Sequence, residues 1–189
     1  LNDCSGNPSS NSDEWDGVQT GVGDVIRLNN GTLIMYYFGG SNEELSMGPG
    51  TILGFRMRIG RAVSVDHGRS WKKTGVCLDY DETEGLFASW PRIAHHDETN
   101  DEWRMIYHAF NGTRWRVFGA NSSDGGITWQ RDGLLLEGTP EEQMEDAFDG
   151  SGIGTRAILN DWYNGTLMVY EGVRPSDGKH SLGVAWHPS

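Results

Sequence analysis

Two aspartates recur at matching positions and are the first candidates for chemistry. Asp16 lies in "WDGVQTGVGDVI" and Asp149 lies in "FDGSGIGTRAIL", and both stand at the same distance before a Met-x-Tyr segment. Two carboxyl groups on either side of one bond can act as general acid and as base or nucleophile, which is the chemistry of glycoside hydrolysis. The same aspartates could instead cap a repeated loop, and the sequence leaves both interpretations open.

Two further acidic residues extend this set. Asp24 precedes the apolar segment "VIRL", where a buried carboxyl group would suit acid–base work, although a turn residue is the alternative. Glu171 follows the third Met-x-Tyr segment, where Phe38 and His108 stand in the other copies, and could be an acid or the partner of Arg174. We therefore predict that the catalytic candidates are Asp16, Asp24, Asp149 and Glu171.

Aromatic and basic side chains near the same segments could hold a sugar. The face of an indole ring packs well on the C–H face of a sugar, and two tryptophans fall outside the expected core. Two arginines, Arg92 and Arg156, lie in or near expected strands that correspond to the strand of Asp24. We therefore predict that the substrate-binding residues are Trp90, Arg92, Arg156 and Trp162. His95 and His96 could be metal ligands, but lone histidines are more often hydrogen-bonded surface or core residues, so the sequence predicts no metal and no cofactor.

The elements that must position these residues form a repeat. Three apolar segments share the Met-x-Tyr pattern, at 34–39, 104–109 and 167–172, and each follows a turn signal typical of a hairpin. A further strand follows each one, with alanines in register at Ala62, Ala120 and Ala185. We therefore predict that each unit forms four strands: a first strand, which we call the inner strand, the Met-x-Tyr strand, a third strand and a short fourth strand. The one helix signal lies at 139–148.

Two turns carry the pattern S-x-D-x-G-x-[ST]-W, at 64–71 and 122–129. Asp66 and Asp124 can accept hydrogen bonds from the backbone of their own turns, and the closing tryptophans can pack beneath them. This pattern is the Asp box, and it indicates a structural role on the outer rim rather than catalysis. The acidic runs at 79–84 and 141–146 lack calcium-loop spacing and are interpreted as solvated loops.

The run "MVYEGVRPSDGKHSLGVAW" and the turn "SSDGGITW" resemble the five-bladed propellers of the arabinanase, levansucrase and invertase superfamily. The resemblance covers the chain from about Trp15 onward, and the sialidases, which share the Asp box, are the second resemblance. It implies an all-β propeller of which this chain supplies about three blades. It also implies a central funnel where inner strands present carboxylates to a sugar.

The resemblance implies a glycoside hydrolase-like, carbohydrate-active protein. The chain departs from that pattern at the inner strands, where the familiar Asp-Pro is replaced by "GDV", "WPR" and "GTR". This departure favours the alternative, a non-catalytic propeller that serves as a binding or scaffold subunit of a larger assembly. Whether the chain is an enzyme therefore stays open.

Composition limits the partners. The 189 residues carry a formal net charge of −12, which disfavours nucleic acid and favours a neutral substrate, a cation or a basic protein surface; the resemblance implies that the partner is a neutral saccharide. No apolar run is long enough for membrane insertion. We expect a flexible tail at 1–14 and a partial propeller at 15–189, with a protein partner as one way to cover its open edge.

Secretion or an organelle lumen is the expected location. Asn-x-Ser/Thr sequons are compatible with it, although Asn-Gly-Thr is also good turn chemistry; they begin at Asn30, Asn111, Asn121 and Asn164. A Cys4–Cys77 disulfide would imply an oxidising compartment, and two independent thiols are the alternative.

Overall fold

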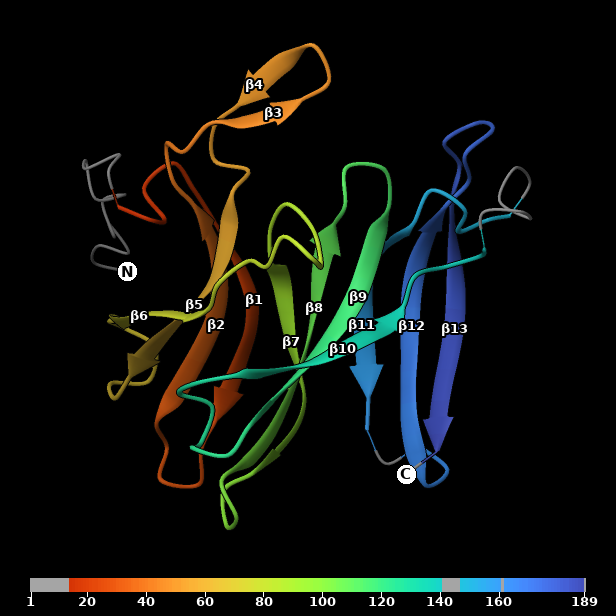
Figure 1. Ribbon diagram of the computed structural model, residues 1–189. Coiled ribbons are helices and arrows are strands. Elements are labelled where there is room, and N and C mark those ends of the chain that lie inside the picture. The colour runs from red at the N-terminus through yellow and green to blue at the C-terminus, as the bar shows by residue number, and fades with distance from the viewer. Residues whose placement is uncertain (1–13, 141–146, 161, 189) are drawn as a thin grey trace.

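A computed structural model describes residues 14–140, 147–160 and 162–188. These residues form three main antiparallel sheets that follow one another along the chain and stand side by side in Figure 1, and a fourth sheet of two short strands. The expected tail lies, apart from Glu14, outside the described residues, as do Cys4 and most of the helix signal at 139–148. The described residues contain no helix long and apolar enough to cross a membrane.

The first and second sheets have four strands each, and the third has three. The first sheet has the order β1 (Gln19–Arg27), β2 (Leu33–Gly40), β5 (Met57–Ser64), β6 (Lys72–Leu78). The second has the order β7 (Ser89–Asp97), β8 (Glu102–Phe110), β9 (Trp115–Ser122), β10 (Gln130–Leu136). The third has the order β11 (Ile153–Leu159), β12 (Gly165–Val173), β13 (His180–Pro188).

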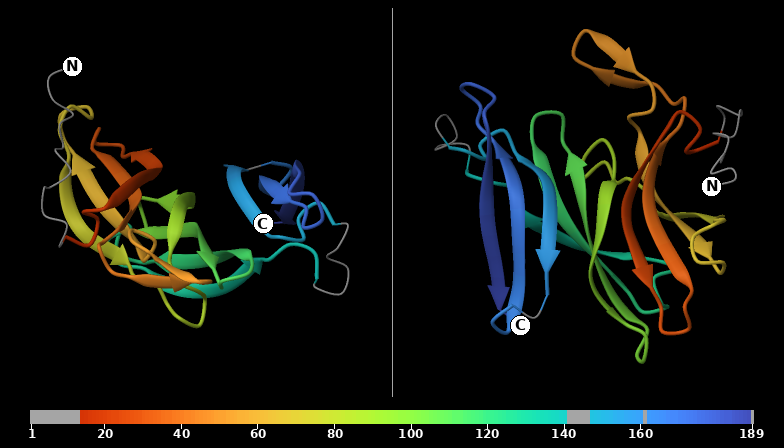
Figure 2. Two further views of the ribbon diagram at one scale, coloured as in Figure 1. Left: turned by 90° about the horizontal axis from the view of Figure 1, so that it is seen from above. Right: turned by 180° about the vertical axis from the view of Figure 1, so that it is seen from behind.

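The repeat predicted from the Met-x-Tyr pattern is confirmed at the level of strand register. The Met-x-Tyr strands are β2, β8 and β12, each in second place in its sheet. Their methionines pair with the three alanines that the sequence placed in register: Met35 with Ala62, Met105 with Ala120, and Met168 with Ala185. The first strands, β1, β7 and β11, lie innermost in the arc of sheets seen from above in Figure 2.

Sequence reasoning missed a small hairpin between β2 and β5. It consists of β3 (Leu45–Met47) and β4 (Gly50–Ile52), and it projects beyond the first sheet at the upper end of Figure 1. Strands of three residues are too short to show an alternating pattern. The sequence does contain a turn signal there, Gly48 followed by Pro49, and Gly48 adopts a φ of 61° in the turn.

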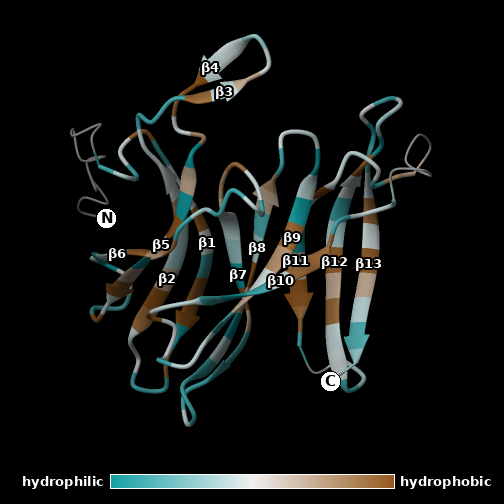
Figure 3. Cartoon of the chain, viewed as in Figure 1, coloured by the Kyte–Doolittle hydropathy of each residue, from teal (hydrophilic) through white to brown (hydrophobic). Residues whose placement is uncertain are grey.

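The core lies between neighbouring sheets. One buried cluster joins β2 and β5 of the first sheet to the second sheet, with Tyr36, Ile59 and Met105 fully buried. Another joins the second sheet to the third through Val117 and Ile153. Figure 3 shows the corresponding apolar segments within the strands and hydrophilic hairpin ends. Burial of apolar side chains on both faces of the second sheet is what holds the three sheets together.

The two Asp turns satisfy their own backbones. Ser70 N donates to Asp66 Oδ1 at 2.9 Å, and Thr128 N donates to Asp124 Oδ1 at 2.9 Å. Burial alone would raise the pKa of Asp124, but hydrogen bonds, chiefly from Thr128, lower it to about 2. The second turn also joins two sheets, since the Tyr36 hydroxyl donates to Gly126 O at 2.8 Å.

A buried carboxylate accepts the hydroxyl of the Met-x-Tyr tyrosine in every sheet. The three pairs are Tyr37 with Asp16 at 3.0 Å, Tyr107 with Glu84 at 2.6 Å, and Tyr170 with Asp149 at 3.1 Å. The acceptors are 4%, 7% and 4% exposed, respectively. Burial, followed by the neighbouring Asp149, raises the pKa of Tyr170 to about 12. These tyrosines therefore stay protonated and donate at neutral pH.

Glu84 corrects the interpretation of 79–84 as a solvated loop. The carboxylate is buried and also meets Arg131 Nε at 3.1 Å. In the first sheet Lys73 Nζ meets Asp16 Oδ2 at 2.7 Å, and both cations stand two residues after the tryptophan of an Asp turn. The second unit has Ala88 where the others have Asp, so its tyrosine takes a carboxylate from the preceding loop.

The tyrosine–carboxylate pair yields a stability prediction. A Tyr107→Phe substitution removes the hydroxyl donor and leaves Glu84 buried with one fewer hydrogen bond, which should cost about 1–3 kcal/mol. A Tyr163→Phe control, at a residue that is 80% exposed, should stay within about 0.5 kcal/mol of the parent. Urea unfolding measures both, and equal midpoints for the two variants would refute a structural pair.

The second Asp turn yields a second stability prediction. Gly126 has a φ of 75°, and an added Cβ would overlap the Tyr36 hydroxyl. Gly112 has a φ of 99° with open space around it, so it isolates the backbone penalty from the clash. We expect Gly112→Ala to cost about 1–2 kcal/mol and Gly126→Ala about 1–3 kcal/mol more. Equal losses in thermal unfolding would show that the sheets do not pack tightly at this turn.

Candidate functional site

The three inner strands share an irregularity near their beginnings. The register with the second strand shifts between Val22 and Asp24 in β1, between Ser89 and Arg92 in β7, and between Ile153 and Arg156 in β11. Such shifts bend a strand and change the direction of its side chains, and they are frequent next to functional sites. Four of the eight candidate residues lie at these shifts: Asp24, Trp90, Arg92 and Arg156.

Trp90, inside the shift of β7, has a strained backbone. Its φ is 46°, which is rare for a bulky side chain and costs of order 1–3 kcal/mol. The half-buried ring packs beside Phe38 and Trp115, with ring centroids 4.6 Å and 5.4 Å away. The ring of His108 lies 6.1 Å away. The ring also packs against the buried cluster formed by Phe38, Met57 and Phe87, so the surrounding side chains fix its position.

Side chains at the shifts tie the inner strands together. Arg156 Nη2 donates to the carbonyl of Trp90 at 2.9 Å, and Arg92 Nη1 donates to the carbonyl of Gly23. Asp24 Oδ2 accepts a hydrogen bond from the amide of Ile93 at 3.0 Å. These bonds fix β7 to β1 and β11 to β7 at the irregularities. Arg156 thereby positions Trp90 directly, and all three side chains remain candidates for ligand contact.

The electrostatics of this end are set by one buried and one half-buried arginine and by an uncharged imidazole. Arg156 is 4% exposed, and burial, followed by the like charge of Arg92, lowers its pKa to about 9. His108 is 2% exposed, and burial, followed by Arg156, lowers its pKa well below the usual value. At neutral pH the site therefore holds two arginine cations beside a neutral histidine.

The predicted carboxylates are not brought together. Asp16 precedes the first sheet and Asp149 precedes the third, with the second sheet between those two sheets (Figure 2), and each carboxylate accepts a hydrogen bond from the tyrosine of its own blade. Glu171 Oε1 lies 2.6 Å from His180 Nδ1, whereas its proposed partner Arg174 pairs with an aspartate instead. These contacts are structural in type, and the catalytic roles stay predictions.

Trp162 lies away from the inner-strand shifts. It stands in the turn after β11, whereas Trp90 lies near the beginning of β7. Its ring is 44% exposed and meets Tyr163 edge-on at 5.0 Å. The structure therefore does not bring the two predicted sugar platforms into one site.

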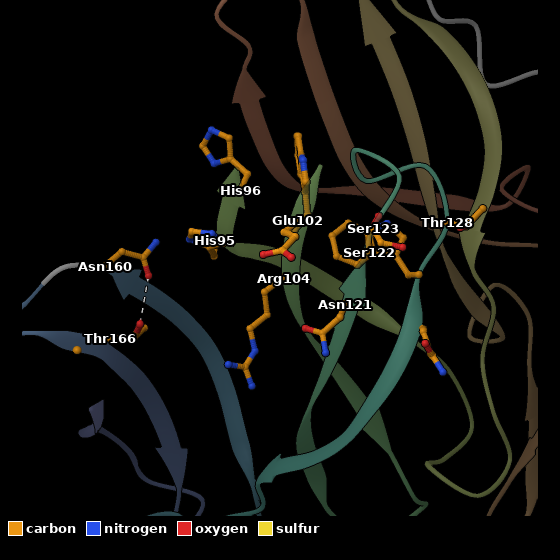
Figure 4. Close-up of a pocket in the computed structure, with 14 residues that line it drawn as sticks. His95, His96, Glu102, Arg104, Asn121, Ser122, Ser123, Thr128, Asn160 and Thr166 are labelled. Atoms are coloured by element: carbon orange, nitrogen blue, oxygen red, sulfur yellow. Dashed lines mark hydrogen bonds between the residues drawn. The ribbon is translucent and has the colours of Figure 1, made fainter. Parts of the chain in front are cut away.

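A cavity of about 1060 Å³ opens between the second and third sheets, at the end of the blades where β7 ends and β8 begins (Figure 4). In Figure 4, Asn160 and Thr166 lie on the third sheet and face Glu102, Arg104 and Asn121 of the second. None of the eight predicted site residues lines this cavity. The inner-strand end, which has the strained tryptophan and the unusual electrostatics, is therefore the better candidate site. Among the described residues, no group of His, Cys, Asp and Glu side chains could hold a metal ion.

Comparison with known proteins gave a clear result only for structure. No protein-family model and no curated protein matches the sequence. Among solved structures, the chain is similar to Zg3597, a family 117 glycoside hydrolase from Zobellia galactanivorans, with a TM-score of 0.66 and 16% identity. It is also similar to β-1,2-mannobiose phosphorylase from Listeria innocua, with a TM-score of 0.61 and 14% identity.

These structures identify the fold. The chain has a β-propeller fold. A third similar propeller is an α-L-arabinofuranosidase from Clostridium thermocellum, with a TM-score of 0.51 and 11% identity. The alignments cover 95%, 89% and 90% of this chain but only 57%, 41% and 56% of those chains. The three sheets are thus propeller blades with the fold of glycoside hydrolases and phosphorylases, and the chain spans about half of such a protein.

His108 supplies a pH prediction for the site. Its folded pKa is depressed, so below the unfolded value near 6.5 the unfolded chain binds more protons and stability falls as pH falls. The loss should be about 1.4 kcal/mol per pH unit below that value. A His108→Phe variant, which copies the residue of the first blade, should lack this component. A His187→Gln control, at an exposed residue, should keep it, and identical pH profiles for all three proteins would contradict burial of His108.

Proposed function

We propose that this propeller is a carbohydrate-active, glycoside hydrolase-like protein that binds a saccharide where the inner strands β7 and β11 begin. The observation that carries the proposal is Trp90, whose strained backbone and aromatic neighbours hold an indole ring at this end. Strain of this kind persists where the surrounding structure enforces it, and it clusters at ligand sites. The likeness to carbohydrate enzymes supports the same conclusion.

Binding is better supported than hydrolysis for the described residues. Hydrolysis needs two carboxyl groups about 5–9.5 Å apart across one glycosidic bond. Asp16 and Asp149 are occupied by tyrosines in separate blades, and Asp24 accepts the amides of Val25 and Ile93. If the protein is an enzyme, we propose that Asp16, Asp24, Asp149 and Glu171 supply the catalytic carboxylates. We also propose that the complete propeller has five blades and that the protein is secreted.

Calorimetric titration with arabinan, fructan and sialoside oligosaccharides tests this proposal. Trp90→Ala should weaken binding of whichever saccharide binds the parent by about tenfold, which corresponds to about 1.4 kcal/mol. Trp162→Ala is the matched control and should bind like the parent. Failure of every saccharide to bind would refute the function, and a larger effect of Trp162→Ala would move the site to the other end.

A hydrolysis assay separates the enzymatic form from the binding form. Release of reducing sugar by the parent, lost in Asp24→Asn, would establish catalysis with that residue in the mechanism. No release, with saccharide binding intact, is the result that we expect.

The alternative is a scaffold propeller in a larger assembly, and one surface offers a test of it. Leu182, Val184 and Trp186 alternate along β13 and are 78%, 65% and 52% exposed. Leu182 is equivalent to Ile59 and Val117, which are buried between successive sheets, so this row is a face that either a further blade or a partner would cover. Size-exclusion chromatography with light scattering tests it, because an uncovered row predicts self-association that Leu182→Glu and Val184→Glu abolish.

A further inference from the structure

Large aromatic side chains meet across the first and second blades but not across the second and third. Between the first two blades, Tyr36 packs edge-on against Trp103, with ring centroids 6.4 Å apart, and its hydroxyl donates to Gly126 O at 2.8 Å. Counted from the methionines of the repeat, the equivalent of Tyr36 in the second blade is Ile106. The equivalent of Trp103 in the third blade is Thr166, which lines the cavity of about 1060 Å³. Two aromatic rings of the repeat are therefore replaced by smaller side chains where this cavity opens.

Amide and hydroxyl groups from both blades make up much of the cavity wall. Asn121 and Gln130 come from the second blade, and Asn160 and Thr166 come from the third (Figure 4). The side chains of Asn121 and Gln130 are exposed and form no hydrogen bond in the described part of the chain. A carboxamide offers two donors and one acceptor oxygen in one plane, which suits a sugar hydroxyl because that group both donates and accepts.

The charges of the wall do not select an ion. Arg104 is the one arginine among the lining residues, and it pairs with Asp132 at 3.2 Å. Glu102 is the one carboxylate among them. A wall with a single charge of each sign favours an uncharged ligand, because neither sign dominates the local potential.

An indole ring completes the wall. Trp129 is half-buried and lines the cavity, and it packs edge-on against Tyr36, with ring centroids 5.6 Å apart. The edge-on contact holds the ring in place, so it loses little conformational freedom when a ligand packs on it.

We propose that this cavity is a second saccharide site, which takes a neutral oligosaccharide. A largely preformed concave space with aromatic surface and a few convergent polar groups is the usual form of a small-ligand site. The cavity lies where β7 ends, whereas Trp90 lies where β7 begins, so the two sites are at opposite ends of the second blade. The inference takes its ligand class from the proposed saccharide function and adds a separate place of binding.

Titration of the chain with arabinan and fructan oligosaccharides tests the second site. Calorimetry counts the binding events, and the indole N–H signals in two-dimensional NMR locate them. We expect two events for each chain, one that shifts the Trp90 signal and one that shifts the Trp129 signal. Trp162 does not line the cavity, so its signal should stay in place. A Trp129 signal that does not move at saturation would overturn the proposal.

Thr166→Trp is the decisive variant, because it restores the residue of the second blade and fills the cavity. It should weaken the event at Trp129 at least about tenfold, a difference of about 1.4 kcal/mol, and leave the event at Trp90 unchanged. Tyr163→Trp is the matched control, since it places an indole on the same hairpin at a residue that is 80% exposed and does not line the cavity. The control should keep both events, and equal affinities for Thr166→Trp and the parent would refute the site.

Asn121→Ala decides the matter if Thr166→Trp does not fold. Asn121 is exposed, so its loss should leave the melting temperature within about 1 °C of the parent while the event at Trp129 weakens about tenfold. Unchanged affinity in Asn121→Ala would then overturn the proposal.

The two sites fail in distinguishable ways. If only the Trp90 signal responds, the proposed function stands and the second site is refuted. If only the Trp129 signal responds, the second site stands and the proposed location at Trp90 fails. If no oligosaccharide binds, both fail.

Discussion

The hydrogen bond between a buried carboxylate and the tyrosine of each Met-x-Tyr strand is the constraint that fixes where each inner strand begins. It joins the loop before the inner strand to the second strand, and in two blades a cation from the fourth strand joins it as well. Because the pair recurs in all three blades, the inner strands begin at equivalent places. The candidate site exists only because these beginnings are held side by side.

The sequence predicted what depends on periodicity and could not predict what depends on the approach of one sheet to another. The register of Met35 with Ala62 follows from the repeat, because strand pairing is local. The repeat could not predict the role of Glu84, because its loop does not align with the loops of the other copies. The one signal was that the second unit has Ala88 in place of the aspartate, which leaves the hydroxyl of Tyr107 in need of another acceptor. The contact of Arg156 with the carbonyl of Trp90 joins two blades, so no spacing along the chain encodes it.

The recurring aspartates hold the tyrosines of their blades, and their catalytic roles stay predictions, whereas residues at the strand irregularities have the strained backbone and the perturbed pKa values. Asp16 and Asp149 recur because every blade needs an acceptor for its tyrosine. Trp90 and Arg156 do not recur as a pair; Trp90 has the strained backbone and Arg156 is the buried charge. In a repeat protein, symmetry therefore marks stability, and departure from symmetry is the better indicator of function.

The central claim is that saccharide is bound at the inner-strand end beside Trp90. Titration of the isotope-labelled chain with oligosaccharide, followed through the indole N–H signals of its tryptophans in two-dimensional NMR, tests it most directly. The account predicts that the Trp90 signal, assigned with Trp90→Phe, shifts in a saturable way while that of Trp162 stays in place. A shift confined to Trp162, or to Trp103 and Trp129 beside the cavity at the other end, would contradict it.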